Sequence, residues 1–183
     1  MPEDALPLQG LVVVEFSTSV AGPFAGQVLA DLGAVVFKVE RPDGGDDARH
    51  WGPPFVDGVA PVFQTLNRNK HSLAVNLKDK SERAALAAFI RDRADIVVQN
   101  LRAGALDAVG LDGTTLTAAK PSLVYCNVGA FGRTGPLRDA PGYDPLIQAA
   151  SGLMSMLGNP GEPTSRVPVA INDMGTGIWA VVG

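Results

Sequence analysis

The chain's length, composition and charge are those of an ordinary globular domain. It has 183 residues, 46% of them hydrophobic and 19% charged, and its 15 basic and 19 acidic side chains give a formal net charge of −4. This balance argues against a general nucleic-acid-binding protein, which needs a basic surface to neutralise phosphates. The single cysteine, Cys126, excludes an intrachain disulfide, and the apolar run around it predicts a buried structural thiol.

No segment of the sequence predicts export or insertion into a membrane. No apolar stretch approaches the ~20 residues that a spanning helix needs. The first ten residues carry Glu3 and Asp4 and no basic region, unlike a signal peptide. Because no disulfide framework exists, a reducing compartment is the natural location. We therefore expect a cytoplasmic protein without a membrane partner.

Short apolar runs alternate with helical patterns along the chain. Residues 11–16 form a run rich in β-branched side chains, which is typical of a strand covered on both faces. A helix opened by Gly22-Pro23 and a strand at 35–39 follow, so these elements predict a right-handed βαβ unit. The further strands expected are 72–77, 95–99 and 123–128, and the further helices are 81–90 with Ser81 as N-cap, 104–109, 114–119, 145–157 and 174–183.

This order of elements predicts an α/β fold, with a Rossmann-like, mainly parallel sheet and flanking helices. Ligands of such folds bind beyond the carboxyl ends of the strands. The loops in which to search are therefore residues 17–23, 41–45, 78–80, 100–104 and 129–143.

Several common catalytic motifs are absent. The sequence has no G-x-G-x-x-G after the first predicted strand, no Walker A lysine motif and no G-x-S-x-G elbow. Its two histidines, His50 and His71, accompany no Cys/His cluster, so we expect no metal site and interpret both as surface residues.

Basic side chains follow three of the predicted strands. Arg41, Lys78 and Arg102 each come after a strand, so they can line one rim of the sheet and meet phosphate groups. The alternative is that they are solvated surface charges, and spacing does not decide between the two.

Two aspartates precede predicted helices. Asp144 follows the glycine-rich segment 129–142 and fits either an N-cap or a pocket residue. Asp173 precedes Gly175 and Gly177, which admit a substrate, so it fits either an N-cap or a nucleophile.

Blocks spread along the chain resemble one known family. They include Ala21-Gly22-Pro23 after the first predicted strand, Lys38-Val39-Glu40-Arg41-Pro42, Asn67-Arg68-Asn69-Lys70, Gln99-Asn100-x-Arg102-x-Gly104, Gly132-x-x-Gly135-Pro136 and Gly142-Tyr143-Asp144-x-x-x-Gln148. From about Leu6 to its end the chain is similar to the class III coenzyme A-transferases, whose relatives include formyl-CoA, carnitine-CoA and oxalate-type transferases and α-methylacyl-CoA racemases.

The resemblance implies a covalent mechanism. Asp173 matches the family's catalytic aspartate, which attacks an acyl-CoA thioester to give an aspartyl mixed anhydride and free CoA thiolate. The thiolate or an acceptor carboxylate then continues the exchange. The expected partners are thus an acyl-CoA and a carboxylic acid, and no permanently bound cofactor is implied.

Binding positions can also be carried across from the family. At two positions where formyl-type members have basic residues that contact CoA, this chain has Ala108 and Pro141. The resemblance therefore implies that CoA is held differently here, or that the formyl and oxalate substrate class does not apply. The positions that match CoA contacts are Val20, Ala21, Arg41, Val75, Lys78, Tyr143 and Asp144.

Two other functions stay open at this point. One is an acyl-CoA racemase or isomerase of the same family, although racemases carry a histidine where this chain has Tyr143, a poor base at neutral pH. The other is a CoA-binding module without turnover. We expect residues 1–183 to be the amino-terminal part of a large domain, with a second domain and a carboxyl-terminal segment outside this chain, and the full-length protein to be an interlocked homodimer.

Overall fold

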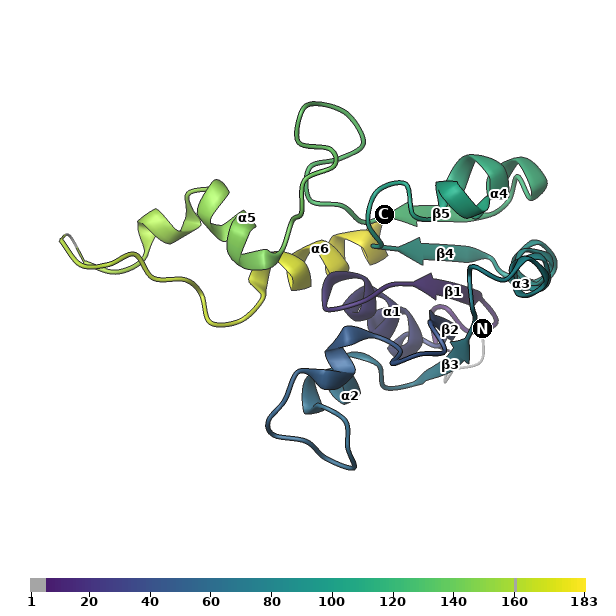
Figure 1. Ribbon diagram of the computed structural model, residues 1–183, viewed down its shortest axis with the longest axis horizontal. Coiled ribbons are helices and arrows are strands. Elements are labelled where there is room, and N and C mark those ends of the chain that lie inside the picture. The colour runs from purple at the N-terminus through teal and green to yellow at the C-terminus, as the bar shows by residue number, and fades with distance from the viewer. Residues whose placement is uncertain (1–5, 160) are drawn as a thin grey trace.

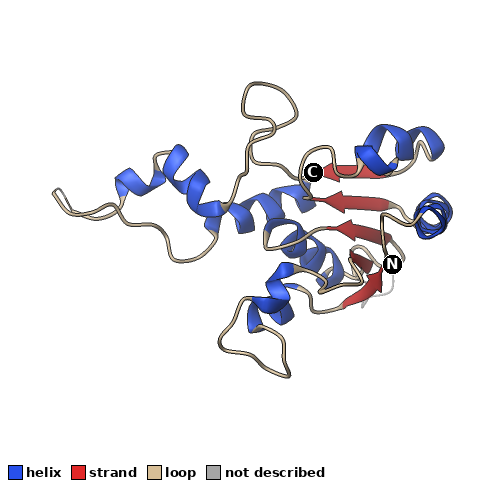
Figure 2. Ribbon diagram, in the orientation of Figure 1, coloured by secondary structure: helices blue, strands red, loops and turns tan. Residues whose placement is uncertain are grey.

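The computed structural model describes residues 6–159 and 161–183, and its centre is a parallel β-sheet (Figures 1 and 2). Five strands pair in parallel in the order β3-β2-β1-β4-β5. The predicted α/β fold is confirmed. The strands are β1 (Val12–Phe16), β2 (Val35–Glu40), β3 (Lys70–Ala74), β4 (Ile96–Gln99) and β5 (Val124–Asn127), and the α-helices are α1 (Ala21–Asp31), α2 (Pro61–Leu66), α3 (Lys80–Arg93), α4 (Gly113–Ala119), α5 (Asp144–Ala150) and α6 (Ile171–Val182).

Helices cover both faces of the sheet. Val14 and Phe16 of β1 pack in one apolar cluster with residues of α3 and α4. Val13, which points to the opposite face, packs in a second cluster with residues of α1 and, at its margin, α6. Alternate side chains of a strand point to opposite faces, so a run that is apolar at successive positions is buried on both sides.

Helix α6 lies directly against α1 (Figure 1). Gly177 is the buried contact residue of α6, and a Cβ atom there would lie 2.9 Å from the carbonyl oxygen of Ala21. Any other residue at this position would force the two helices apart. This close contact packs the middle of α6 against the first turns of α1.

Three elements differ from the sequence-based expectations. Strand β3 begins and ends earlier than residues 72–77. The N-cap of α3 is Asp79, not Ser81, because an Asp79 carboxylate oxygen accepts hydrogen bonds from the backbone N–H groups of Ser81 at 2.8 Å and Glu82 at 3.0 Å. Helix α2 was not expected.

The other differences are in the ends of the helices. Helix α6 begins at Ile171, earlier than the predicted residue 174, and two other predicted helices are shorter than their patterns suggested. Within 104–109, residues Asp107–Val109 form a 3-10 turn. Helix α5 ends at Ala150, and Gly152 in a left-handed conformation (φ 81°) separates it from the 3-10 turn Leu153–Met156. Figure 1 shows α5 and the segment after it projecting away from the sheet.

A buried network of charges joins β1, β2 and β3. The Lys38 ammonium group lies 3.1 Å from a Glu15 carboxylate oxygen and 3.0 Å from an Asp46 carboxylate oxygen, and it donates to the Ser17 carbonyl at 2.8 Å. The Lys70 ammonium contacts the other Glu15 oxygen at 2.8 Å, and the side chains of Glu15 and Lys38 are 0% and 1% exposed. Buried charges of this kind persist only when each is paired.

The network leaves no space at Gly26 of α1. A Cβ atom at Gly26 would lie 1.8 Å from a Glu15 carboxylate oxygen. Glycine there lets the helix backbone lie directly over the buried carboxylate. The packing of α1 on the sheet therefore depends on the same charges.

We predict that Lys38→Met in the full-length protein lowers the free energy of unfolding by about 3–5 kcal/mol, because Asp46 and part of Glu15 lose their buried counter-charge. Urea-induced unfolding followed by circular dichroism measures this. Lys78→Met is the matched control, since Lys78 is exposed. Equal unfolding midpoints for the two variants would contradict the assignment of Lys38 as the centre of the network.

Candidate active site

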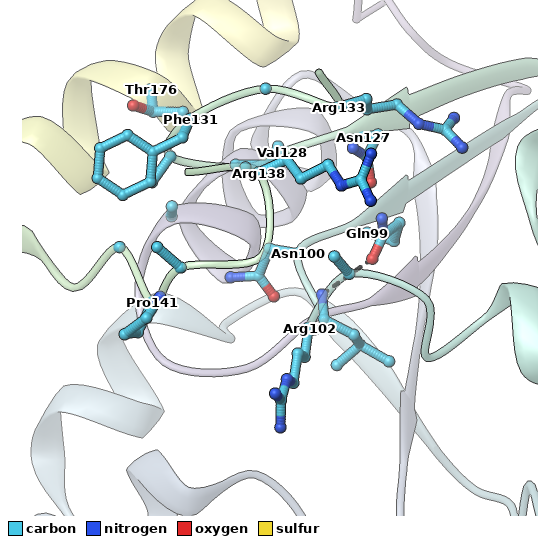
Figure 3. Close-up of a pocket in the computed structure, with 18 of the residues that line it drawn as sticks. Gln99, Asn100, Arg102, Asn127, Val128, Phe131, Arg133, Arg138, Pro141 and Thr176 are labelled. Carbon is cyan, nitrogen blue, oxygen red and sulfur yellow. Dashed lines mark hydrogen bonds between the residues drawn. The ribbon is translucent and has the colours of Figure 1, made fainter. Parts of the chain in front are cut away.

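A cavity of about 980 Å³ opens beyond the carboxyl ends of β1, β4 and β5, where the fold class predicts ligand binding. Its walls are the loops after these strands and the first turn of α6 (Figure 3). Figure 3 shows Asn100 and Arg102 entering from the loop after β4, Phe131, Arg133 and Arg138 from the loop after β5, and Thr176 from α6.

The loop after β1 is held in place by hydrogen bonds from two other segments. The Asn100 side chain accepts from the Thr18 N–H and donates to the Thr18 carbonyl, both at 2.9 Å. Asp46 accepts from the Ser19 N–H at 3.1 Å, and Ser19 has a positive φ of 68°. This wall of the cavity is therefore tied to the buried charge network through Asp46.

Val20 and Ala21, two positions that the resemblance matches to CoA contacts, lie on this wall. Both line the cavity, with Val20 at the N-cap position of α1 and Ala21 buried as its first residue. Because a helix N-terminus carries unpaired N–H groups and a positive partial charge, this wall suits an anionic ligand group.

Asp173 lines the cavity from the first turn of α6 and is half-buried. Burial, together with the nearby negative charge of Asp144, raises the pKa of Asp173 to about 6. A carboxylate with a raised pKa is more basic than an exposed aspartate and is still ionised at neutral pH. A Cβ atom at Gly175 would meet nothing within 4 Å, but Gly175 does not line the cavity, so this glycine is not needed for access to Asp173.

Asp144 lies below the cavity surface and is only 3% exposed. One of its oxygens accepts hydrogen bonds from the backbone N–H groups of Asn172 at 2.7 Å and Asp173 at 3.3 Å, and the other accepts from the Gln148 side chain. The sequence offered Asp144 as an N-cap or a pocket residue. In the structure it caps α6 rather than its own helix, whose N-cap position is Tyr143.

Tyr143 and Arg102 both line the cavity. The Tyr143 side chain is 67% exposed, and Arg102 is exposed as well. Both side chains are therefore accessible from the cavity, and their contact with CoA stays a prediction.

The other three predicted positions lie elsewhere. Arg41 is exposed and pairs with Asp47, Val75 belongs to the apolar cluster under α3, and Lys78 is exposed after β3. None of them lines the cavity, although Asp47 does. Their contact with CoA remains a prediction from the resemblance.

Sequence reasoning missed two cavity arginines, Arg133 and Arg138. Figure 3 shows their side chains over the carboxyl ends of β4 and β5, whereas Arg102 projects the other way. Both belong to the glycine-rich segment 129–142, which follows a predicted strand. Their basic character within that segment is the sequence feature that could have indicated them as ligand-binding residues. With Arg102 they give the cavity three guanidinium groups, which suit phosphate or carboxylate groups.

The two histidines and the cysteine lie outside the cavity lining. His50 and His71 are exposed, as predicted, and the half-buried Cys126 has a thiol whose pKa is raised by burial. Over residues 6–159 and 161–183, no set of three or more His, Cys, Asp or Glu side chains is arranged to hold a metal ion. No helix in these ranges has the length and apolar character needed to cross a membrane.

Comparison with known proteins identifies the family. The model of CoA-transferase family III matches residues 8–183. The chain belongs to this family. Among curated relatives, the succinate–glutarate CoA-transferase of Agrobacterium fabrum is 42% identical over 99% of this chain and 46% of its own length. The human succinyl-CoA:glutarate CoA-transferase is 41% identical over 95% of this chain and 40% of its own length.

Solved structures agree with this family assignment. A CAIB/BAIF family protein from Brucella suis is 42% identical and superimposes with a TM-score of 0.92, over 98% of this chain and 48% of that protein. A hypothetical protein from Mycobacterium tuberculosis is 34% identical, with a TM-score of 0.87 over 97% of this chain and 48% of its own. The chain therefore spans about half the length of the CoA-transferase family III proteins it matches.

The raised pKa of Asp173 predicts a stability cost at neutral pH. The folded state binds the Asp173 proton more tightly than the unfolded state, so the contribution of this group to stability falls as pH rises to about 6 and stays low above it. Asp173→Asn should therefore stabilise the full-length protein at pH 8, by about 1 kcal/mol or less because solvent reaches the carboxylate.

Thermal unfolding at pH 8 and pH 5 checks this prediction. The gain in melting temperature of Asp173→Asn should be larger at pH 8. Asp43→Asn, which removes an exposed carboxylate, serves as the control. A gain that is the same at both pH values would show that the Asp173 carboxylate is not destabilised by its surroundings.

Proposed function

We propose that the protein transfers coenzyme A between an acyl-CoA and a carboxylic acid, with Asp173 as the covalent nucleophile. The observation that carries this proposal is the half-buried Asp173 carboxylate at the edge of a large, arginine-lined cavity. Membership of CoA-transferase family III and relatives named as CoA-transferases support it.

The first step forms a mixed anhydride. The ionised Asp173 carboxylate attacks the thioester carbonyl carbon, a carbon–oxygen bond forms, and the carbon–sulfur bond breaks with its electron pair on the CoA thiolate. A carboxylate with a raised pKa suits this step, because nucleophilicity rises with basicity while the group stays ionised above about pH 6.

The remaining steps move CoA to the acceptor. The thiolate attacks the Asp173 carbonyl carbon, which releases the donor acid and leaves an aspartyl thioester. The acceptor carboxylate then attacks this thioester to give a second anhydride and free thiolate. Attack of the thiolate on the acceptor acyl carbon completes the exchange and regenerates Asp173. Each step exchanges one acyl bond for another, so the residues present need no metal or organic cofactor beyond CoA itself.

The basic side chains of the cavity suit these substrates, although Arg133 and Arg138 lie within 4 Å of Asp107 and Asp139. Arg102, Arg133 and Arg138 line it. Guanidinium groups bind phosphates and carboxylates bidentately. Because relatives are named for succinate and glutarate, short dicarboxylic acids are the acceptor class to test first.

The racemase alternative is not favoured. Its reaction needs a second group that can exchange a proton at the α-carbon. The position that carries histidine in racemases is Tyr143 here, and the histidines of this chain, His50 and His71, do not line the cavity. The interlocked homodimer, the second domain and the cytoplasmic location expected from the sequence remain predictions.

We predict that Asp173→Ala and Asp173→Asn in the full-length protein abolish CoA exchange between succinyl-CoA and glutarate while leaving CoA binding nearly intact. In the wild-type protein, the rate of the first half-reaction should fall as pH decreases through about 6, because the protonated carboxyl group does not attack. Exchange assays and calorimetric CoA titration measure these quantities.

Asp43→Asn, with an exposed carboxylate away from the cavity lining, should exchange CoA at the wild-type rate. Turnover above a tenth of the wild-type rate in Asp173→Ala would overturn the assignment of the nucleophile.

A further inference from the structure

The first turn of α6 lacks the usual cap from its own chain segment. Its N-cap residue, Ala170, has no side chain that can accept a hydrogen bond from the first turn. The N–H groups at the second and third positions of a helix normally bond to the N-cap side chain. In α6 these positions are Asn172 and Asp173, and both bond to one oxygen of Asp144, a residue of α5.

A second contact ties the segment before α6 to the same helix. Gln148 is fully buried, and its side-chain oxygen accepts from the Val167 N–H at 2.8 Å while its amide group donates to the Val167 carbonyl at 3.2 Å. Gln148 also donates to the second oxygen of Asp144. Residues four apart lie on the same face of a helix, so α5 presents Asp144 and Gln148 together toward the chain that leads into α6.

We propose that Asp144 and Gln148 are positioning residues that hold Asp173 at the edge of the cavity. Asp144 is 3% exposed and does not line the cavity, and both of its oxygens accept hydrogen bonds within the protein, one from α6 and the other from Gln148. Its role is therefore to fix the backbone that carries Asp173, and not to contact CoA directly. The expected effect on catalysis rests on the proposed function of Asp173 as the nucleophile. The expected ordering of the α6 backbone does not depend on that function.

The charge of Asp144 has a separate effect. Asp173 is the only titratable residue of α6, Asp144 is the only one of α5, and the packed helix α1 carries only Asp31, its last residue. Beside burial, Asp144 is the charge that raises the pKa of Asp173. The remaining charged or titratable side chains that line the cavity are Asp47, Arg102, Asp107, Asp112, Tyr125, Arg133, Arg138, Asp139 and Tyr143.

Two substitutions separate the hydrogen bonds that Asp144 accepts from α6 from the effect of its negative charge. Asp144→Asn keeps an oxygen that can accept from α6 but removes the negative charge, so the acid limb of the rate of the first half-reaction should shift to lower pH. Asp144→Ala removes the acceptor as well. It should make the backbone amides of residues 172 and 173 exchange hydrogen about fivefold faster, as expected for loss of one cap, and lower kcat about 10–100-fold with little change in KM for acyl-CoA.

The experiment combines hydrogen exchange with pH–rate profiles on the full-length protein, with Gln148→Leu as an independent variant. Gln148→Leu should speed amide exchange at Val167 without removing the Asp144 charge. Asp43→Asn is the control for charge removal and should leave both measurements at the wild-type values. If Asp144→Ala folds poorly, Asp144→Asn still tests the effect of the Asp144 charge, and Gln148→Leu still tests the contact between α5 and Val167.

The outcomes distinguish this inference from the proposed function. Unchanged amide exchange in Asp144→Ala and Gln148→Leu, with an unshifted acid limb in Asp144→Asn, would overturn the positioning role even if Asp173→Ala is inactive. Faster amide exchange together with an active Asp173→Ala would support the positioning role and overturn the nucleophile.

Discussion

The pairing of Lys38 with Glu15 and Asp46 is the interaction on which the rest of the structure depends. It places charges in the interior of a parallel sheet, where each is stable only beside its partner. Lys38 also bonds to the Ser17 carbonyl, and Asp46 bonds to the Ser19 N–H, so the network shapes the loop that leads from β1 into α1. The cavity wall is thus an extension of the core. A loop tied in this way is held in one conformation, which favours a preorganised site.

Asp173, the proposed nucleophile, is held by a second set of contacts, which come from α1 and α5. Helix α6 contacts α1 through Gly177, which sets the distance between the two helices, and α5 caps the first turn of α6 through Asp144. The cap has two consequences for Asp173 that act together. It orders the backbone that carries the carboxylate, and its negative charge keeps that carboxylate more basic than an exposed aspartate. A neutral or positive group beside Asp173 would stabilise the folded protein more than the Asp144 carboxylate does. The cost in stability at neutral pH is therefore consistent with selection for reactivity.

Sequence patterns predicted the fold and the cavity's location well, and individual contacts less well. Runs such as Val12–Phe16 carry apolar side chains on both faces, so four strands were found within one or two residues of their ends. Strand β3 was shifted because it is an edge strand whose residues are mostly exposed, and its apolar alternation continues past its end to Leu77.

The resemblance indicated Asp173 as the nucleophile, whereas the sequence pattern alone left it as either a helix cap or a nucleophile. The bond from Asp144 to Asn172 joins residues 28 apart, and no local spacing rule predicts such a contact. For the same reason, Glu15 and Lys38 look like ordinary alternating polar positions until the strands are paired.

In the proposed mechanism, acyl exchange passes through the Asp173 carboxylate. When CoA moves from one acid to another, the donor acyl group must gain one oxygen atom. In the proposed sequence of steps that oxygen comes from Asp173, and Asp173 regains one from the acceptor acid. The most direct measurement is turnover of succinyl-CoA with glutarate whose carboxylates carry heavy oxygen, followed by mass analysis of peptides. This mechanism requires that heavy oxygen enters the peptide that contains Asp173, and no other peptide. Product formation with an unlabelled Asp173 peptide, and with heavy oxygen passing directly into the released succinate, would contradict it.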